Sequence, residues 1–432
     1  MANAVEKVNG IAIASIEAIN GKTDDNIQAL NGLEFTGSTT VSEDMPLSNV
    51  LQYTVMTNHW SGGWVYRDGV TDKVLAVYNN QTGGGIIEVI DVPATASATL
   101  TVDSTATLAG VDSGREIAVD TDPSTENEGV AAYPLSSDSG HGRVVRVTVS
   151  EADESVSTGT AVEFSTEYAY EVCVAHDKKR AGDFVVMWRN TSPYEMFLIA
   201  GTTSGTTISL GSATRINNGA GTPSDVSGYY PSIAADPHTA GRYVLQYNDT
   251  SNITVQVITV SGTTITFGAS VSPGSDAGYT PTRTGVTWDN QTADKIHTIY
   301  SDAESSNYYP TVAAATVSTR TLSFGTPEVV ESVYREGTSI SSDYFIANAG
   351  FVTTEMGPSG NATVKVFAWT VSGTDYTIGN SNVATTDPAT VRGSQIASPY
   401  TGGLHLIMYK DNTSSTPNYE GRLATYQLGG TY

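Results

Sequence analysis

The chain has 432 residues, of which 21 are Lys or Arg and 45 are Asp or Glu, so its formal net charge at pH 7 is −24. Such an excess of negative charge repels phosphate backbones and anionic lipid, which excludes nucleic acid and membrane surfaces as expected partners. The 42 Gly and 23 Tyr, with only 15% charged residues, favour strands and tight turns over long helices and predict an all-β fold.

The first 32 residues differ in pattern from the rest and form a predicted leader. Ile16, Ile19, Ile27 and Leu30 recur there at helical i,i+3 intervals, which predicts two short helices. Helices of about two turns are marginal alone, so their apolar faces must rest on something, either the flank of the main domain or a partner protein. These four side chains are therefore the predicted partner-docking residues, on a leader of residues 1–32 that precedes a domain of residues 33–432. The N-terminus shows no basic segment followed by an apolar one, and no run of about 18 apolar residues occurs, so neither a secretion signal nor a membrane span is expected.

Beyond the leader, an apolar run, a turn and a second apolar run repeat along the chain. The clearest copy spans residues 233–249, where Asp236 and Pro237 supply the turn. The matching turn positions lie 50 to 59 residues apart, at Asp68, Asp122, Asp177, Asp236, Asp289, Asn348 and Ser398. The repeat has seven copies.

Two further landmarks keep the same period. The second strand recurs at residues 74–78, 184–188, 243–247, 296–300 and 404–409, and a closing strand ends at Gly211, Gly268, Gly325 and Gly379. Each unit therefore has four short antiparallel strands, which one unit cannot bury until neighbours stack on both sides. The prediction is a seven-bladed β-propeller of four-stranded blades; a pair of β-sandwiches is the alternative.

The last copy stops after three strands. Residues 33–41 resemble the closing strand at 264–271, so we expect this N-terminal strand to complete the last blade and to close the ring without an unpaired edge.

The leader also carries a resemblance. Residues 8–21 and 26–35, with Asn-Gly pairs at 9–10, 20–21 and 31–32, resemble the opening of structural proteins of tailed phages, especially marine ones. The Ser-Gly-Thr-Thr-Ile repeats at 204–208 and 261–265 are similar to those of propeller-like phage tail proteins. The resemblance implies a virion component, such as a tail, tail fibre or particle-surface protein, assembled in the host cytoplasm and present in several copies. Its partners would be other virion proteins through the leader, with a host-surface glycan or protein as a further partner.

Residues suited to metal or acid–base chemistry show no recognisable spacing. The six histidines are scattered singly, and no pair of carboxylates can be nominated among 45 acidic residues, so no catalytic residue, metal site or cofactor is expected. The acidic turn from Asp120 to Glu128 lacks the alternating spacing of known calcium loops and is interpreted as a solvated turn rather than a Ca²⁺ site. Cys173, the only cysteine, is expected to be a buried thiol.

Tyrosines give the best indication of a binding surface. Tyr168, Tyr170, Tyr229, Tyr230 and Tyr279 all fall just before the first strand of a blade, on the connections along one face of the ring. Their rings either bind a ligand, by stacking on sugars or anchoring a protein, or pack blade against blade. The resemblance to tailed-phage proteins, taken with these tyrosines, implies a non-enzymatic virion structural protein with a role in host attachment; a glycan-binding lectin or a polysaccharide-degrading enzyme is the alternative.

Overall fold

The computed structural model describes residues 73–80, 84–91, 101–112, 115–191, 195–216, 231–249, 252–274, 285–302, 309–333, 335, 337–343, 346–355 and 364–383. It also gives the backbone pairing of short strands before residue 65 and of strands at 395–397, 404–411 and 420–427. These parts of the chain are all-β, apart from one 3-10 turn, η3 (Ser136–Asp138). None of their helices is long and apolar enough to span a bilayer.

The longer strands form seven antiparallel sheets of four or five strands, numbered here in chain order. Sheets 1 to 3 contain β8 (Met56–Trp64), β9 (Lys73–Asn80), β10 (Gly84–Asp91) and β11 (Thr101–Leu108); β12 (Ala118–Thr121), β13 (Glu128–Leu135), β14 (His141–Val149), β15 (Val156–Thr158) and β16 (Val162–Tyr168); and β17 (Glu171–His176), β18 (Asp183–Arg189), β19 (Met196–Ser204), β20 (Thr207–Leu210) and β21 (Thr214–Arg215).

Sheets 4 to 7 continue the series. They contain β22 (Ser232–Ala235), β23 (Arg242–Asp249), β24 (Asn252–Ser261) and β25 (Thr264–Val271); β26 (Gly285–Trp288), β27 (Lys295–Asp302), β28 (Tyr309–Ser318), β29 (Thr321–Phe324) and β30 (Glu328–Val329); β31 (Gly337–Ser342), β32 (Ala349–Glu355), β33 (Val364–Ser372) and β34 (Asp375–Val383); and β35 (Gln395–Ala397), β36 (Leu404–Asp411), β37 (Glu420–Gln427) and β7 (Leu51–Tyr53). The predicted second strands lie in β9, β18, β23, β27 and β36, which confirms the four-strand unit.

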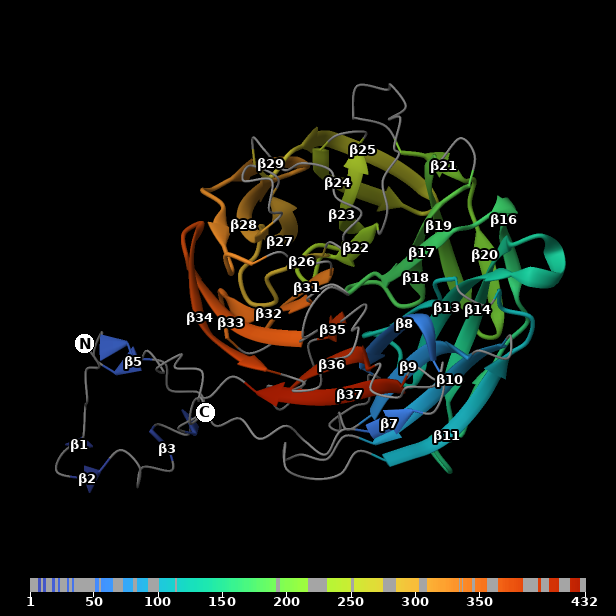
Figure 1. Cartoon of the computed structure of the whole chain (residues 1–432), viewed down its shortest axis with the longest axis horizontal. Helices are drawn as coiled ribbons and strands as arrows, with labels where there is room; N and C mark the ends of the chain where they lie inside the picture. The colour runs from blue at the N-terminus through green and yellow to red at the C-terminus, as the bar shows by residue number, and fades with distance from the viewer. Residues whose placement is uncertain are drawn as a thin grey trace.

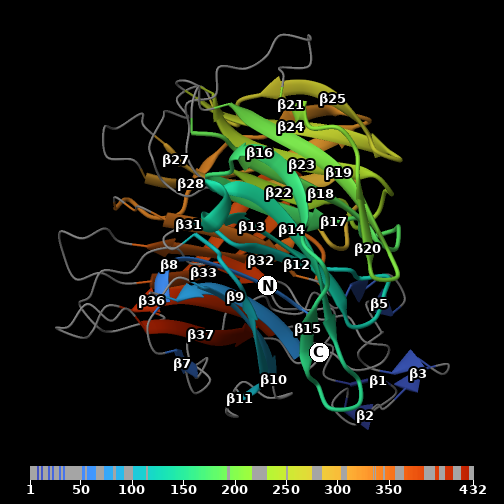
Figure 2. The same ribbon diagram turned by 90° about the vertical axis from the view of Figure 1, so that its right-hand side faces the viewer.

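The sheets are set around a common centre, as in a β-propeller (Figure 1). The first strand of each sheet lies innermost and contacts the first strands of the sheets before and after it, and β35 of the last sheet contacts β8 of the first. Figure 2 views the same sheets from the side, with strands of sheets 2, 3 and 4 following one another.

Strand alternation places each apolar face against a neighbouring sheet. Along β18, Val185 and Met187 pack toward sheet 4, whereas Phe184, Val186 and Trp188 pack toward sheet 2. Since successive side chains of a strand point to opposite faces, every central strand contributes to two cores. This double burial explains why the second strands read as continuous apolar runs rather than as alternating ones.

The turn between the first two strands repeats in sheets 2 to 6. An Asp begins it, and five residues later a residue with positive φ precedes the second strand; the pairs are Asp122 and Asn127, Asp177 and Gly182, Asp236 and Gly241, Asp289 and Asp294, and Asp343 and Asn348. The backbone N–H of each of these Asp residues bonds across the turn to the carbonyl of the residue that starts the second strand. The expected equivalence of Asn348 with the Asp positions is therefore wrong, because Asp343 begins the turn of sheet 6 and Asn348 fills its left-handed position.

Three of these carboxylates also join neighbouring sheets. Asp122 Oδ2 accepts the Gly182 N–H at 2.7 Å, Asp177 Oδ2 accepts the Gly241 N–H at 2.6 Å, and Asp289 Oδ2 accepts the Asn348 N–H at 2.9 Å. Each carboxylate thus holds its own turn and the equivalent turn of the next sheet.

The periodic closing glycines have a packing role. A Cβ added to Gly268 would lie 2.3 Å from the Arg320 carbonyl oxygen of the next sheet, and one on Gly211 would lie 2.5 Å from Thr263 Cβ. Such contacts leave no space for a side chain. Glycine recurs at this position because the turn between the third and fourth strands of the next sheet presses against its backbone.

The helices predicted for the leader are wrong at the residues that the structure describes. Two-residue antiparallel ladders occur instead: β1 (Lys7–Val8) with β2 (Ile11–Ala12), β3 (Ala18–Ile19) with β4 (Lys22–Thr23), and β5 (Ala29–Leu30) with β6 (Leu33–Glu34). Each ladder flanks one of the Asn-Gly pairs, the strongest short-range signal for a hairpin. The Asn-Gly signal at a period of eleven outweighs the i,i+3 spacing of the isoleucines.

The strand expected at residues 33–41 is also misplaced. The fourth strand of sheet 7 does come from the N-terminal part of the chain, but it is β7, in which Leu51, Gln52 and Tyr53 pair with Leu423, Arg422 and Gly421. Leu33 and Glu34 already pair with β5, so their backbone groups are engaged elsewhere.

Candidate functional site

The site is built where sheet 2 passes to sheet 3. Because the strands alternate in direction, the Asp turns lie on one face of the ring, and the connections between sheets lie on the opposite face together with the turns between second and third strands. The short connection after β16 runs through Ala169 and Tyr170. It is fixed by the Ala169 N–H bonding the Gly140 carbonyl at 2.9 Å and the Tyr170 N–H bonding the Arg189 carbonyl at 2.7 Å.

The Tyr168 hydroxyl links a cation and an anion. Arg115 Nε donates to the Tyr168 phenol oxygen at 2.6 Å, and the phenol donates to Asp112 Oδ2 in a short hydrogen bond. Burial, followed by the hydrogen bond to Asp112, raises the pKa of Tyr168, so the phenol stays protonated at neutral pH. The Tyr168 ring also lies against Gly140, where a Cβ would come within 2.3 Å of it.

Tyr170 lies next to Tyr168, with 6.4 Å between ring centroids, and is held by two guanidinium groups. The Cζ atoms of Arg115 and Arg189 lie 4.2 Å and 4.7 Å from its ring centroid, both within cation–π range. Arg189 is buried and pairs with buried Glu171, with Nε 3.2 Å from Oε2. The second arginine therefore has a carboxylate that balances its charge.

We call the group of Arg115, Asp112, Tyr168 and Tyr170 the junction cluster. It reaches the surface, because each of these residues is half-buried. Among the described residues, no carboxylate lies within ion-pair distance of the Arg115 guanidinium. The cluster therefore offers guanidinium N–H donors next to a carboxylate acceptor. Two arginines lie over the Tyr170 ring, so the junction cluster presents hydrogen-bonding groups beside its aromatic rings.

The other predicted residues divide into two groups. Ile19 lies in β3 and Leu30 in β5, where the structure gives backbone pairing alone. The remaining five lie outside the described residues, and they are Ile16, Ile27, Tyr229, Tyr230 and Tyr279.

The acidic turn from Asp120 to Glu128 is more than a solvated loop. Asp120 Oδ2 accepts the His176 N–H at 2.8 Å and pairs with Lys178 Nζ at 3.2 Å, and Glu128 pairs with Arg146. Asp122 is 1% exposed and caps its own turn. Each of these three carboxylates thus has a hydrogen-bond or ion-pair partner within the protein.

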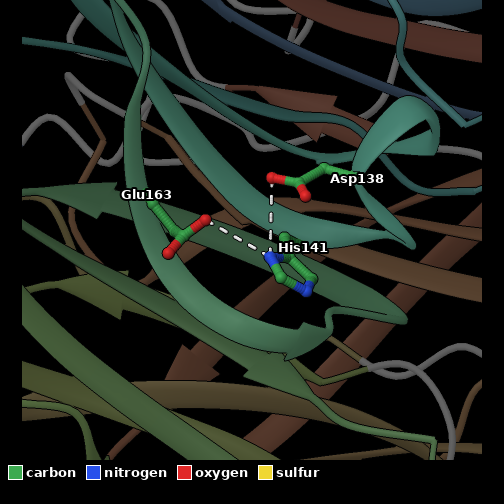
Figure 3. Close-up of side chains that lie close together, drawn as sticks. All are labelled: Asp138, His141 and Glu163. Carbon is green, nitrogen blue, oxygen red and sulfur yellow. Dashed lines mark hydrogen bonds and ion pairs between the residues drawn. The ribbon is translucent and has the colours of Figure 1, made fainter.

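A cluster with no signal in the sequence is formed by Asp138, His141 and Glu163 (Figure 3). It adjoins the junction cluster, because His141 pairs with Tyr168 in the ladder of β14 and β16. His141 Nδ1 lies 3.5 Å from Asp138 Oδ2 and 3.3 Å from Glu163 Oε2, and Arg143 Nη2 pairs with both carboxylates, at 2.9 Å from Glu163. Asp138 and His141 are separated by three positions, but Glu163 comes from β16, which pairs with β14. Only this strand pairing brings it to the histidine, so no local motif could have revealed the group.

His297 is a structural residue of β27 rather than a free base. It is fully buried, with Nε2 3.1 Å from Asp289 Oδ2 and Nδ1 2.8 Å from the Tyr376 hydroxyl. Burial lowers its pKa, so its ring is neutral at pH 7. Cys173 is only half-buried, and its Sγ lies 2.8 Å from the Pro231 carbonyl oxygen.

Comparison with known proteins identifies the fold. No protein-family profile and no curated protein matches the sequence. Among solved structures, the BP39L lectin from Burkholderia pseudomallei is similar over 87% of this chain and 98% of its own, with a TM-score of 0.63 and 11% identity. The polysaccharide lyase Uly1 is similar over 94% of this chain and 95% of its own, with a TM-score of 0.54 and 10% identity. A COPII outer-coat structure is similar over 88% of this chain and 86% of its own, with a TM-score of 0.52 and 12% identity. The protein is a β-propeller, and at these identities the likeness extends to the fold alone.

Proposed function

We propose that the protein is a carbohydrate-binding β-propeller whose ligand contacts the junction cluster. The observation that carries the proposal is the half-buried Arg115, which lacks a carboxylate partner among the described residues and stands beside Asp112 and two tyrosines. Vicinal sugar hydroxyls both donate and accept hydrogen bonds. They match a guanidinium donor and a carboxylate acceptor placed side by side.

The residues behind the cluster support this role. The buried Glu171–Arg189 pair holds Tyr170 from within, and the Tyr168 phenol fixes both Arg115 and Asp112. Groups preorganised in this way lose little side-chain entropy when a ligand binds. One structural neighbour is a lectin and another a polysaccharide lyase, which is consistent with a propeller that binds carbohydrate.

We further infer that the seven sheets are seven blades of one closed ring. The cyclic contacts of the innermost strands, with β35 against β8, and the pairing of β7 with β37 support closure. Class averages of the purified protein by electron microscopy should show seven equal lobes. Six or eight lobes, or an open arc, would contradict the inference.

A glycan array probed with the full chain, followed by calorimetry on the best oligosaccharide, tests the proposed site. Arg115→Gln should weaken binding by about tenfold, because a charge-assisted hydrogen bond is replaced by a neutral one. The matched control is Lys179→Gln, which removes the same charge from an exposed side chain near the opposite end of β17. Equal affinities of both variants and the wild type, or no glycan bound by the wild type, would refute the site.

We also propose that the propeller is carried on a tailed-phage particle and binds without catalysis. The support is the resemblance of residues 8–35, together with ladders β1–β6, which belong to none of the seven sheets. Deleting residues 1–32 should abolish incorporation into particles while leaving glycan binding intact. Incubation with the bound polysaccharide should release no shorter products, and incorporation of the truncated chain or release of oligosaccharides would each contradict one part of this proposal.

A further inference from the structure

The geometry points to a second site, whose ligands lie outside the proposed glycan site: a divalent transition-metal site of the zinc type formed by Asp138, His141 and Glu163. The three ligand atoms lie within 4.8 Å of one another. An imidazole nitrogen with two carboxylate oxygens is a ligand set that zinc accepts, with a fourth position left for water. The group goes beyond the proposed function because the junction cluster uses none of these side chains.

The distances fit such an ion. Ligand atoms about 2.0 to 2.2 Å from a tetrahedral zinc lie about 3.3 to 3.6 Å apart. His141 Nδ1 lies 3.5 Å from Asp138 Oδ2 and 3.3 Å from Glu163 Oε2. The side chains of Asp138 and Glu163 are 41% and 34% exposed, so small rotations can adjust the remaining separation between their oxygens.

The backbone between the ligands is held in place. Asp138 ends η3, and Ser139 and Gly140 follow with φ of 56° and 79°, which turns the chain so that Asp138 and His141 face the same point (Figure 3). Gly140 is locked by the Tyr168 ring, which leaves no room for a Cβ. The turn therefore presents two ligands without a conformational search, and β16 supplies the third.

Arg143 decides how tightly a metal binds. Its guanidinium pairs with both carboxylates and so supplies the positive charge that a bound metal ion would otherwise supply. Because these ion pairs are partly exposed, they are weak and can be exchanged for coordination bonds. The arginine thus competes with the ion and keeps the carboxylates balanced when no ion is bound.

The experiment is a titration of the full-length protein with ZnCl₂ after treatment with a chelator, followed by calorimetry. We expect saturable binding of Zn²⁺ at this site. Arg143→Gln should tighten binding by about tenfold because two competing ion pairs are removed. His141→Ala should weaken it by at least about tenfold through loss of a ligand. His238→Ala is the control, a half-buried histidine outside the cluster, and should leave the affinity unchanged.

Location is checked by anomalous diffraction at the zinc edge, which should place the ion among Asp138, His141 and Glu163. Failure of both the wild type and Arg143→Gln to bind Zn²⁺, while circular dichroism shows both folded, would overturn the inference. So would binding that His141→Ala leaves unchanged. Glycan affinity serves as the separate readout, so the two proposals can fail independently.

Discussion

The inter-sheet bond of Asp177 can be tested by a single isosteric change. Asp177 is 2% exposed, and its Oδ1 accepts the N–H groups of Lys179 and Arg180 at 2.8 and 3.1 Å, while Oδ2 accepts the Gly241 N–H at 2.6 Å. Asp177→Asn keeps the shape but provides one oxygen in place of two. Its NH₂ group must then face a backbone N–H, which leaves a buried donor without an acceptor.

The expected loss follows from the bonds involved. A hydrogen bond to a charged group contributes about 1.5 to 3 kcal/mol, and orphaning a buried donor costs about 1 to 3 kcal/mol. Because the asparagine retains one of the two sets of bonds, we expect the free energy of unfolding to fall by about 3 kcal/mol, or roughly 4 °C in the thermal midpoint of a domain of this size.

Thermal unfolding followed by tryptophan fluorescence measures this loss. The matched control is Asp153→Asn, which alters an exposed carboxylate that accepts the Ser155 N–H within its own turn, and its midpoint should stay at the wild-type value. If Asp177→Asn unfolds at the same temperature as Asp153→Asn, the carboxylate does not hold adjacent sheets together.

Three further changes probe the same architecture. Gly268→Ala should lower the free energy of unfolding by about 1 to 3 kcal/mol through overpacking against the next sheet. Gly159→Ala should be tolerated, because the nearest atom would lie 3.7 Å from the new Cβ. Equal effects of the two changes in urea unfolding would show that the next sheet does not exclude a side chain at Gly268. Burial lowers the pKa of His176 and His297 in the folded protein. Below the ordinary histidine pKa of about 6.5, the unfolded chain therefore binds more protons than the folded one, and the free energy of unfolding should fall as pH drops from 7 toward 5. A thermal midpoint that does not change with pH over that range would contradict this. Lys73→Met should destabilise by about 3 kcal/mol, because one nearly buried ammonium pairs with three carboxylates in sheets 1 and 2; a urea unfolding midpoint equal to that of the wild type would contradict this.

The repeat can be read from the sequence because its physical cause is local. Two strands joined by an Asp turn, such as residues 233–249, appear in the sequence as apolar runs around a residue that bonds its own turn. The closing glycines were found from spacing, although their cause, contact with the turn of the next sheet, is visible only in the structure. In the leader two local signals compete, and the Asn-Gly hairpins form in place of the helices that the isoleucine spacing predicts.

The sequence by itself determined the all-β class, the period and the four-strand unit, since alternation, turns and glycines are properties of neighbouring residues. Tertiary structure decided which N-terminal strand pairs with β37, and it brought Arg115 to Tyr168 and Glu163 to His141. These contacts join residues far apart in the chain. They depend on how strands pair and sheets stack, which a local pattern does not encode.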